Sequence, residues 1–240
     1  MNAFLSGIAL PVVAVQAMWV RKSTEVLPPA AGPGTGTVGD GPGEPLRLAV
    51  VGESTAAGCG VDSHDEGFTG ALARELGGRT RRPVTWEVIG QNGATSRRIR
   101  HRLLPLLGDG FDLAVLLAGA NDVLSRRSPA EWRADLAAIV EDLAARATHV
   151  VVAGIPPFRE FPSLPGTLAR YLARRAAVLD GVAAQVCAER PGVTWVSSTD
   201  SMPIGPDFFA RDRFHPSSTG YGRWALSVAE HLEPWSETVA

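Results

Sequence analysis

Short apolar runs that end at or near a glycine recur along the chain from residue 46 onward. These runs are Leu46–Val51, Val84–Ile89, Leu113–Ala118, His149–Gly154 and Val193–Val196. Runs of this length that are rich in valine and leucine are typical of strands buried on both faces. The pattern therefore predicts five interior strands.

Segments with helical periodicity separate these runs. They are marked by Phe68, Leu72 and Leu76, by residues 128–146, by Leu164–Arg190, and by Trp224, Val228 and Leu232. The second of them opens with Ser128, Pro129 and Glu131, which form a capping box with proline at the first helical position. Strands that alternate with helices predict an α/β fold, in which a mostly parallel sheet carries helices on both faces.

The first 27 residues show a different pattern. Residues 3–20 contain no charge and are mostly apolar, and this length is at the lower limit for crossing a bilayer. Arg21 and Lys22 follow the stretch, so the positive-inside tendency would place the rest of the chain in the cytoplasm. We expect an apolar N-terminal helix over residues 1–27. Three alternatives stay open: a membrane anchor or in-plane helix, a helix docked on the domain, or a cleaved signal.

Residues 28–45 are expected to form a linker. Eleven of these 18 residues are glycine or proline, so the segment cannot bury enough apolar surface to offset its ordering entropy. Residues 34–39 match the dinucleotide-binding pattern G-x-G-x-x-G. No apolar run precedes the match and no helical pattern follows it, so we interpret it as chance. One α/β domain is expected over residues 46–240.

Composition excludes some functions. A formal net charge of −2 argues against a nucleic-acid-binding protein, which would normally carry a basic face. Cys59 and Cys187 form neither a CxxC pair nor a disulfide framework. No second group of His, Cys or Asp has ligand spacing, so neither a metal nor an organic cofactor is expected.

The candidate chemistry lies in the loops that follow the predicted strands. The carboxyl ends of parallel strands meet at one edge of a sheet, so the loops beginning at glycines 52, 90, 119 and 154 should share a rim. Ser54 follows the first strand, which places its hydroxyl at this rim and its N–H toward a bound anion. By itself, such a serine is more often a helix cap.

Two further loop residues can stabilise negative charge. The amide of Asn121 can face a developing oxyanion, although an Asx-turn is the alternative role for this side chain. Gly93 lets the backbone approach a substrate and offers an N–H donor, although an ordinary Asn-Gly turn explains it equally well.

Near the C-terminus, Asp212 precedes His215 by three residues. A carboxylate at this distance can accept a hydrogen bond from the Nδ1–H of the imidazole and leave Nε2 free as a base. A serine hydroxyl needs such a base before it can act as a nucleophile. A surface histidine with a chance acidic neighbour, or half of a metal site, remains the alternative.

Taken together and in this order, these residues resemble the SGNH hydrolase family, also called GDSL-like lipases and esterases. The family supplies Ser, Gly, Asn and His in that order, with Asp three residues before His. The matching residues here are Ser54, Gly93, Asn121, His215 and Asp212. The resemblance covers about residues 46–232 and implies a flavodoxin-like three-layer α/β/α fold with a five-stranded parallel sheet in the order 2-1-3-4-5. Glu53 departs from the family pattern, which usually has Asp before the serine, and we expect this change to affect loop bracing.

The resemblance implies a serine esterase with Ser54, Asp212 and His215 as catalytic triad. The oxyanion hole would comprise the N–H groups of Ser54 and Gly93 and the side chain of Asn121. The α/β-hydrolase fold is excluded, because its G-x-S-x-G elbow would need glycine at position 56, which is alanine. The expected substrate is a lipid ester or a small acyl ester, with membrane association possible through residues 3–20. Acyl transfer on the same triad, a non-catalytic membrane-associated binding module, and a nucleotide or flavin binder are the alternatives.

Overall fold

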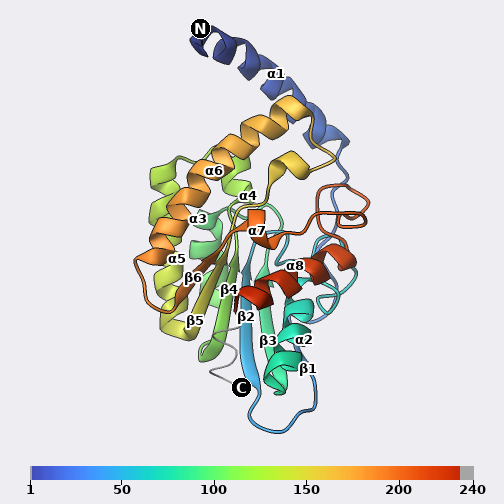
Figure 1. Cartoon of the computed structure of the whole chain (residues 1–240), viewed down its shortest axis with the longest axis vertical. Coiled ribbons are helices and arrows are strands. Elements are labelled where there is room, and N and C mark those ends of the chain that lie inside the picture. The colour runs from blue at the N-terminus through green and yellow to red at the C-terminus, as the bar shows by residue number, and fades with distance from the viewer. Residues whose placement is uncertain (1, 233–240) are drawn as a thin grey trace.

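A six-stranded sheet between two layers of helices forms the centre of the molecule (Figure 1). The computed structural model describes residues 2–232, with side chains for all of these except residues 2–9 and 200. Met1 and residues 233–240 of the expected ranges lie outside the described residues. The strands are β1 (Thr35–Val38), β2 (Leu46–Gly52), β3 (Val84–Gly90), β4 (Phe111–Leu117), β5 (Ala147–Ala153) and β6 (Val193–Val196).

The order of the strands across the sheet is β1-β3-β2-β4-β5-β6. The strands β2 to β6 all pair in parallel. Numbered among themselves, these five have the order 2-1-3-4-5, so the predicted three-layer fold is confirmed. The register pairs Gly52 of β2 with Gly90 of β3 and with Leu117 of β4, which brings three strand ends to one edge.

The sixth strand differs from the expectation. Residues Thr35–Val38, inside the segment expected to be a linker, form β1 and pair antiparallel with β3. The same segment is held elsewhere by backbone hydrogen bonds from the N–H of Ala30 to the carbonyl of Ala57 and from Ala31 to Asp62. Backbone pairing with β3 and the packing of Val38 against the core hold this segment at the sheet edge, and its composition predicts neither contact. The G-x-G-x-x-G match therefore coincides with an edge strand.

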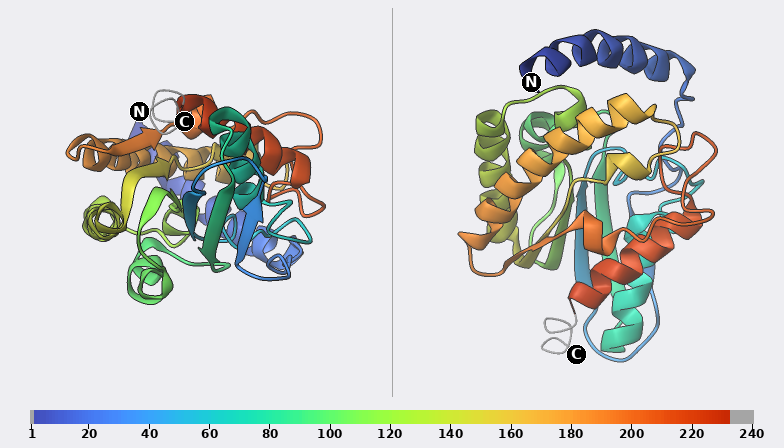
Figure 2. Two further views of the ribbon diagram at one scale, coloured as in Figure 1. Left: turned by 90° about the horizontal axis from the view of Figure 1, so that it is seen from below. Right: turned by 45° about the horizontal axis from the view of Figure 1, so that its top comes forward.

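Helices cover both faces of the sheet (Figure 2, left). The longer ones are α1 (Asn2–Ser23), α2 (Phe68–Thr80), α5 (Pro129–Arg146), α6 (Gly166–Ala188) and α8 (Ser218–His231). The short ones are α3 (Ser96–Arg98), η1 (Ile99–Leu103), η2 (Leu104–Leu106), α4 (Ala120–Leu124), η3 (Phe158–Glu160) and α7 (Ser198–Ser201). The predicted capping box is present at the start of α5, where the hydroxyl of Ser128 accepts a hydrogen bond from the N–H of Glu131.

Two apolar cores lie on opposite faces of the sheet, as the alternation of side chains along a strand requires. Ala49 and Val51 of β2 pack with α5 and α6, whereas Leu48 and Val50 pack with α2 and α8. All four side chains are fully buried, so β2 is the central strand of both cores. A rigid central strand gives the loop that follows it a fixed position.

The N-terminal helix α1 packs against α6. The side-chain carbonyl of Gln16 accepts a hydrogen bond of 2.9 Å from the N–H of Leu168, and Val13 is buried in the contact. Among residues 2–232, no helix combines the length and the apolar character needed to cross a membrane.

Candidate active site

Ser54 lies at the carboxyl end of the central strand, two residues after β2 ends. It begins a series of tight turns rather than a helix, and the next helix is α2. Within these turns, the carbonyl of Ser54 accepts a hydrogen bond from the N–H of Cys59. The residue is 8% exposed, so the hydroxyl has limited access to solvent.

The side chains of His215 and Asp212 complete a chain of hydrogen bonds that starts at Ser54. The Nε2 atom of His215 lies 3.0 Å from the Ser54 hydroxyl oxygen, and its Nδ1 lies 2.6 Å from Oδ2 of Asp212. The structure thus brings together three residues that are separated by up to 161 positions. The base and its orienting carboxylate stand in the order that activation of a serine requires.

Asp212 is held in its ionised form. Its other oxygen, Oδ1, accepts hydrogen bonds of 3.0 Å from the N–H groups of Phe214 and His215. Burial alone would raise the pKa of Asp212, but the hydrogen bonds from the His215 ring and these N–H groups hold it below its ordinary value. The carboxylate therefore stays charged near neutral pH and can stabilise a protonated His215.

The loop that carries these two residues is fixed by a tight turn. The N–H of Ala210 donates to the carbonyl of His215, and Arg213 adopts a left-handed conformation with φ 58°. Gly60, in the turns after Ser54, approaches the same loop closely, since a Cβ at this position would lie 2.3 Å from the carbonyl oxygen of Pro216. Only glycine allows this approach, which sets the distance between the serine and histidine loops.

Glu53 connects Ser54 to the loop after β4. Its carboxylate accepts hydrogen bonds from the N–H of Ala120 at 3.2 Å and the N–H of Asn121 at 3.0 Å. It also accepts one of 2.8 Å from the Asn121 side-chain amide. This bond occupies one amide hydrogen of Asn121 and fixes the amide orientation, which leaves the second hydrogen for another acceptor. The expected bracing role of Glu53 agrees with these contacts.

Burial raises the pKa of Glu53 to about 7, an effect that its hydrogen bonds with Asn121 only partly offset. A carboxyl whose pKa is raised on folding binds more protons in the native chain than in the unfolded one. Its contribution to stability is therefore complete below about pH 4.5 and is lost as the pH rises through about 7.

This linkage gives a pH-dependent prediction. Relative to Glu53→Gln, which does not titrate, we expect the parent to lose about 3 kcal/mol of unfolding free energy between pH 4.5 and 8. Urea unfolding of both proteins at several pH values measures the difference, in which other titrating groups cancel. If the difference in unfolding free energy between the two proteins stayed constant with pH, burial would not raise the pKa of Glu53.

Asp122 connects the segment after β4 to the loop after β3. Its buried carboxylate accepts hydrogen bonds from the N–H of Ser96 at 2.8 Å and from the Ser96 hydroxyl at 2.6 Å. Ser96 follows the loop of Gly93, which is exposed and has φ 75°, a conformation that favours glycine. No atom beyond its chain neighbours lies within 4 Å of a Cβ built at Gly93, so its backbone is open to a ligand.

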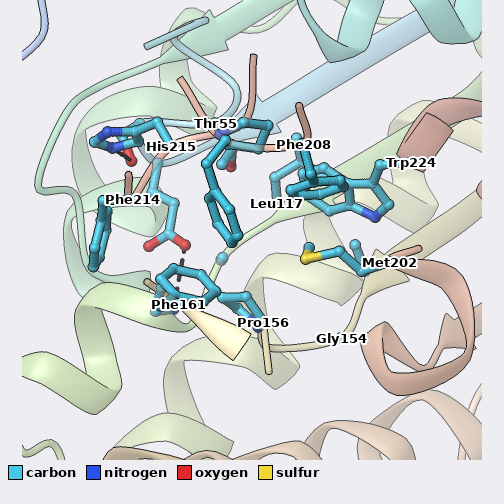
Figure 3. A pocket seen from close by; sticks show the side chains of 17 residues that line it. Thr55, Leu117, Gly154, Pro156, Phe161, Met202, Phe208, Phe214, His215 and Trp224 are labelled. Atoms are coloured by element: carbon cyan, nitrogen blue, oxygen red, sulfur yellow. Dashed lines mark hydrogen bonds between the residues drawn. The ribbon is translucent and has the colours of Figure 1, made fainter. Parts of the chain in front are cut away.

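An apolar cavity of about 40 Å³ lies beside Ser54 and His215 (Figure 3). Phe214 lies beside His215 and packs against Phe161, whereas Met202 and Trp224 lie on the opposite side of the cavity. Glu53 also borders the cavity, next to the serine. Space of this size and character fits a small apolar group attached to a carbonyl at Ser54.

Sequence reasoning missed the residues that form this cavity. Its aromatic walls are Phe161, Phe208, Phe209, Phe214 and Trp224. The four phenylalanines are linked in a row by three edge-to-face contacts. The available signal was the concentration of phenylalanine in residues 158–161 and 208–214, next to the Asp212–His215 motif.

Comparison with known proteins assigns these features to a family. The model of the GDSL-like lipase/acylhydrolase family matches residues 50–223, which include Ser54 and His215. A curated relative, the GDSL-like esterase Rv1075c of Mycobacterium tuberculosis, is 29% identical over 189 residues. The match covers 73% of this chain and 58% of the relative, so the chain corresponds to little more than half of that protein.

Solved structures agree with the fold. TesA superposes with a TM-score of 0.62 at 24% identity, over 79% of this chain and 99% of its own. The esterase AlinE4, described as an SGNH-hydrolase family member, gives a TM-score of 0.55 at 26% identity, over 82% of this chain and 96% of its own. Both alignments extend over about four-fifths of this chain, which supports the same overall fold.

Proposed function

Since the chain belongs to the GDSL-like lipase/acylhydrolase family, we propose that it is a serine esterase of the SGNH type, which cleaves carboxylic esters through an acyl-enzyme on Ser54. The observation that carries this proposal is the continuous hydrogen-bond chain from Ser54 through His215 to Asp212. No metal or organic cofactor takes part in the proposed reaction.

In the first half of the reaction, the Ser54 oxygen attacks the ester carbonyl while His215 Nε2 takes the hydroxyl proton. Asp212 stabilises the imidazolium through its bond to Nδ1. The carbonyl oxygen becomes an oxyanion, which the N–H groups of Ser54 and Gly93 and the free amide hydrogen of Asn121 would bind. The imidazolium then donates its proton to the leaving alcohol as the carbon–oxygen bond breaks.

In the second half, water replaces the alcohol. His215 takes a proton from the water, the hydroxide attacks the acyl carbonyl, and the imidazolium returns the proton to the Ser54 oxygen as the acid leaves. The same groups act in reverse order, so no further residue is needed.

Hydrolysis of p-nitrophenyl acetate by the purified chain tests the proposed activity. We expect saturable release of nitrophenol that is lost on treatment with a fluorophosphonate. Including a primary alcohol separates hydrolysis from acyl transfer, because transfer would yield the new ester in place of free acid. A preparation with no turnover above buffer would contradict the proposal.

The cavity beside Ser54 suggests the acyl chain length. About 40 Å³ holds roughly three water-sized groups, since one such group needs about 10–15 Å³. We therefore propose short acyl groups of about two to four carbons as substrates. Longer chains would have to displace the packed aromatic walls, at a cost similar to overpacking a core.

A series of p-nitrophenyl esters tests this size limit. We expect kcat/KM to be highest for the acetate-to-butyrate esters and to fall by roughly tenfold or more for octanoate, since displacing packed side chains costs about 1–3 kcal/mol. Met202→Ala, at the far end of the cavity, should move the preference toward longer chains. Leu172→Ala truncates a buried side chain outside the cavity and serves as the control. Equal kcat/KM for acetate and octanoate in the parent would contradict the assignment of the cavity.

A further inference from the structure

The outward face of α1 is apolar. Val13, Gln16 and Val20 face the rest of the chain, as their burial shows. On the opposite side, Val15 is 61% exposed, Met18 65% and Trp19 59%. A helix docked on a water-soluble domain normally presents polar residues outward.

This exposure is concentrated in one part of the chain. Of the ten exposed large apolar side chains among the described residues, six fall between residues 10 and 26. Single exposed apolar residues are ordinary, but a contiguous group on one helix marks a binding surface. The face therefore needs a covering partner.

The charges around this face are positive. Arg21 and Lys22 lie in the last turn of α1, and the sequence has no acidic residue before Glu25. Beside the first half of α1, a groove against α6 is lined by Leu10, Tyr171, Arg170 and Arg174. Apolar side chains flanked by exposed arginine and lysine match the surface of an anionic bilayer, where the apolar groups enter the headgroup region.

The position of α1 relates this face to the catalytic edge. The segments α3, α4 and α7 follow β3, β4 and β6, and they lie at the end of the sheet over which α1 runs (Figure 1; Figure 2, right). Ser54 lies at the same end of the sheet, after β2. A partner bound to the outward face of α1 would thus lie on the side of the molecule that holds the candidate site.

We propose that the outward face of α1, together with the arginines of the adjoining α6 groove, docks in the plane of an anionic phospholipid bilayer. A second copy of this chain fits the same face less well, because two such faces would bring basic residues of both copies together and the groove beside the face supplies no acidic partner. The inference concerns binding alone and does not depend on the esterase reaction.

Co-sedimentation of the full chain with vesicles tests the docking. We expect the parent to sediment with vesicles of phosphatidylcholine mixed with phosphatidylglycerol, less with phosphatidylcholine alone, and less in high salt. Val15→Glu/Met18→Glu should reduce binding to the mixed vesicles by roughly tenfold or more. Arg170→Ala/Arg174→Ala should reduce binding to the mixed vesicles only.

The matched control is Leu106→Glu/Leu226→Glu, which adds the same charge at two exposed apolar residues of η2 and α8. It should bind vesicles like the parent, and the thermal unfolding transition of every variant should show that each is folded. Parent protein that stays in the supernatant, an α1 variant that binds like the parent, or self-association through α1 without vesicle binding would overturn the proposal.

Discussion

Replacing Ser54 with alanine is expected to lower kcat for p-nitrophenyl acetate by about 10⁴–10⁶-fold while leaving the fold intact. The substitution removes only the hydroxyl group, whose oxygen forms the covalent bond to the substrate in the proposed mechanism. The side chain lies at a loop and is not part of either apolar core. Initial rates of the parent and of Ser54→Ala, with thermal unfolding of both, measure the effect.

Ser125→Ala provides the matched control for this loss. Ser125 is an exposed serine at the end of α4, on a loop that borders the same rim, and it has no place in the hydrogen-bond chain. The control should keep the parental kcat. A Ser54→Ala protein that retained the parental rate would remove Ser54 from the mechanism.

Asp212→Asn is expected to lower kcat by about 10⁴-fold. Asparagine has nearly the same shape, but its neutral side chain cannot stabilise an imidazolium, and it offers an amide where the Nδ1–H of His215 needs an acceptor. The imidazole would then favour the tautomer that carries its proton on Nε2, so Nε2 could no longer accept the proton of Ser54. Steady-state rates above pH 7 measure the loss.

Asp207→Asn is the corresponding control, since Asp207 is exposed and its left-handed conformation, with φ 61°, is one that asparagine tolerates. We expect this control to retain the parental rate. Equal rates for Asp212→Asn and the control would show that the carboxylate does not orient His215.

Much of the fold follows from local patterns in the sequence. The central strands β2 and β4 are buried along almost their whole length, so they appear as continuous apolar runs, and the capping box of α5 consists of residues within one turn. Both features depend on neighbouring residues alone. The order of the strands came from the resemblance to a family, because periodicity does not determine which strands pair.

Features that depend on contacts between distant segments were not predictable in this way. The strand β1 pairs residues 35–38 with residues 84–87, and its sequence, Thr-Gly-Thr-Val, carries no apolar pattern. The bond between Glu53 and Asn121 spans 68 positions, and only the approach of two loops reveals that the amide is held on one side. The cavity beside Ser54 likewise combines side chains from loops after several strands.

The N-terminal helix shows the same limit. Its apolar composition did not distinguish a membrane anchor from a helix packed on the domain or a cleaved signal. The contact of Gln16 with Leu168 could not be predicted without knowing where α6 lies. Only one side of α1 packs against the domain, so this contact also determines which apolar residues of the helix face outward.

Labelling of the intact protein with a fluorophosphonate, followed by peptide mass spectrometry, tests whether Ser54 is the nucleophile and His215 its base. We expect one adduct per chain on the peptide that contains Ser54, and greatly slowed labelling in His215→Ala, because the base 3.0 Å from the hydroxyl is removed. An unmodified Ser54, or labelling at the same rate without His215, would contradict the proposed nucleophile and its base.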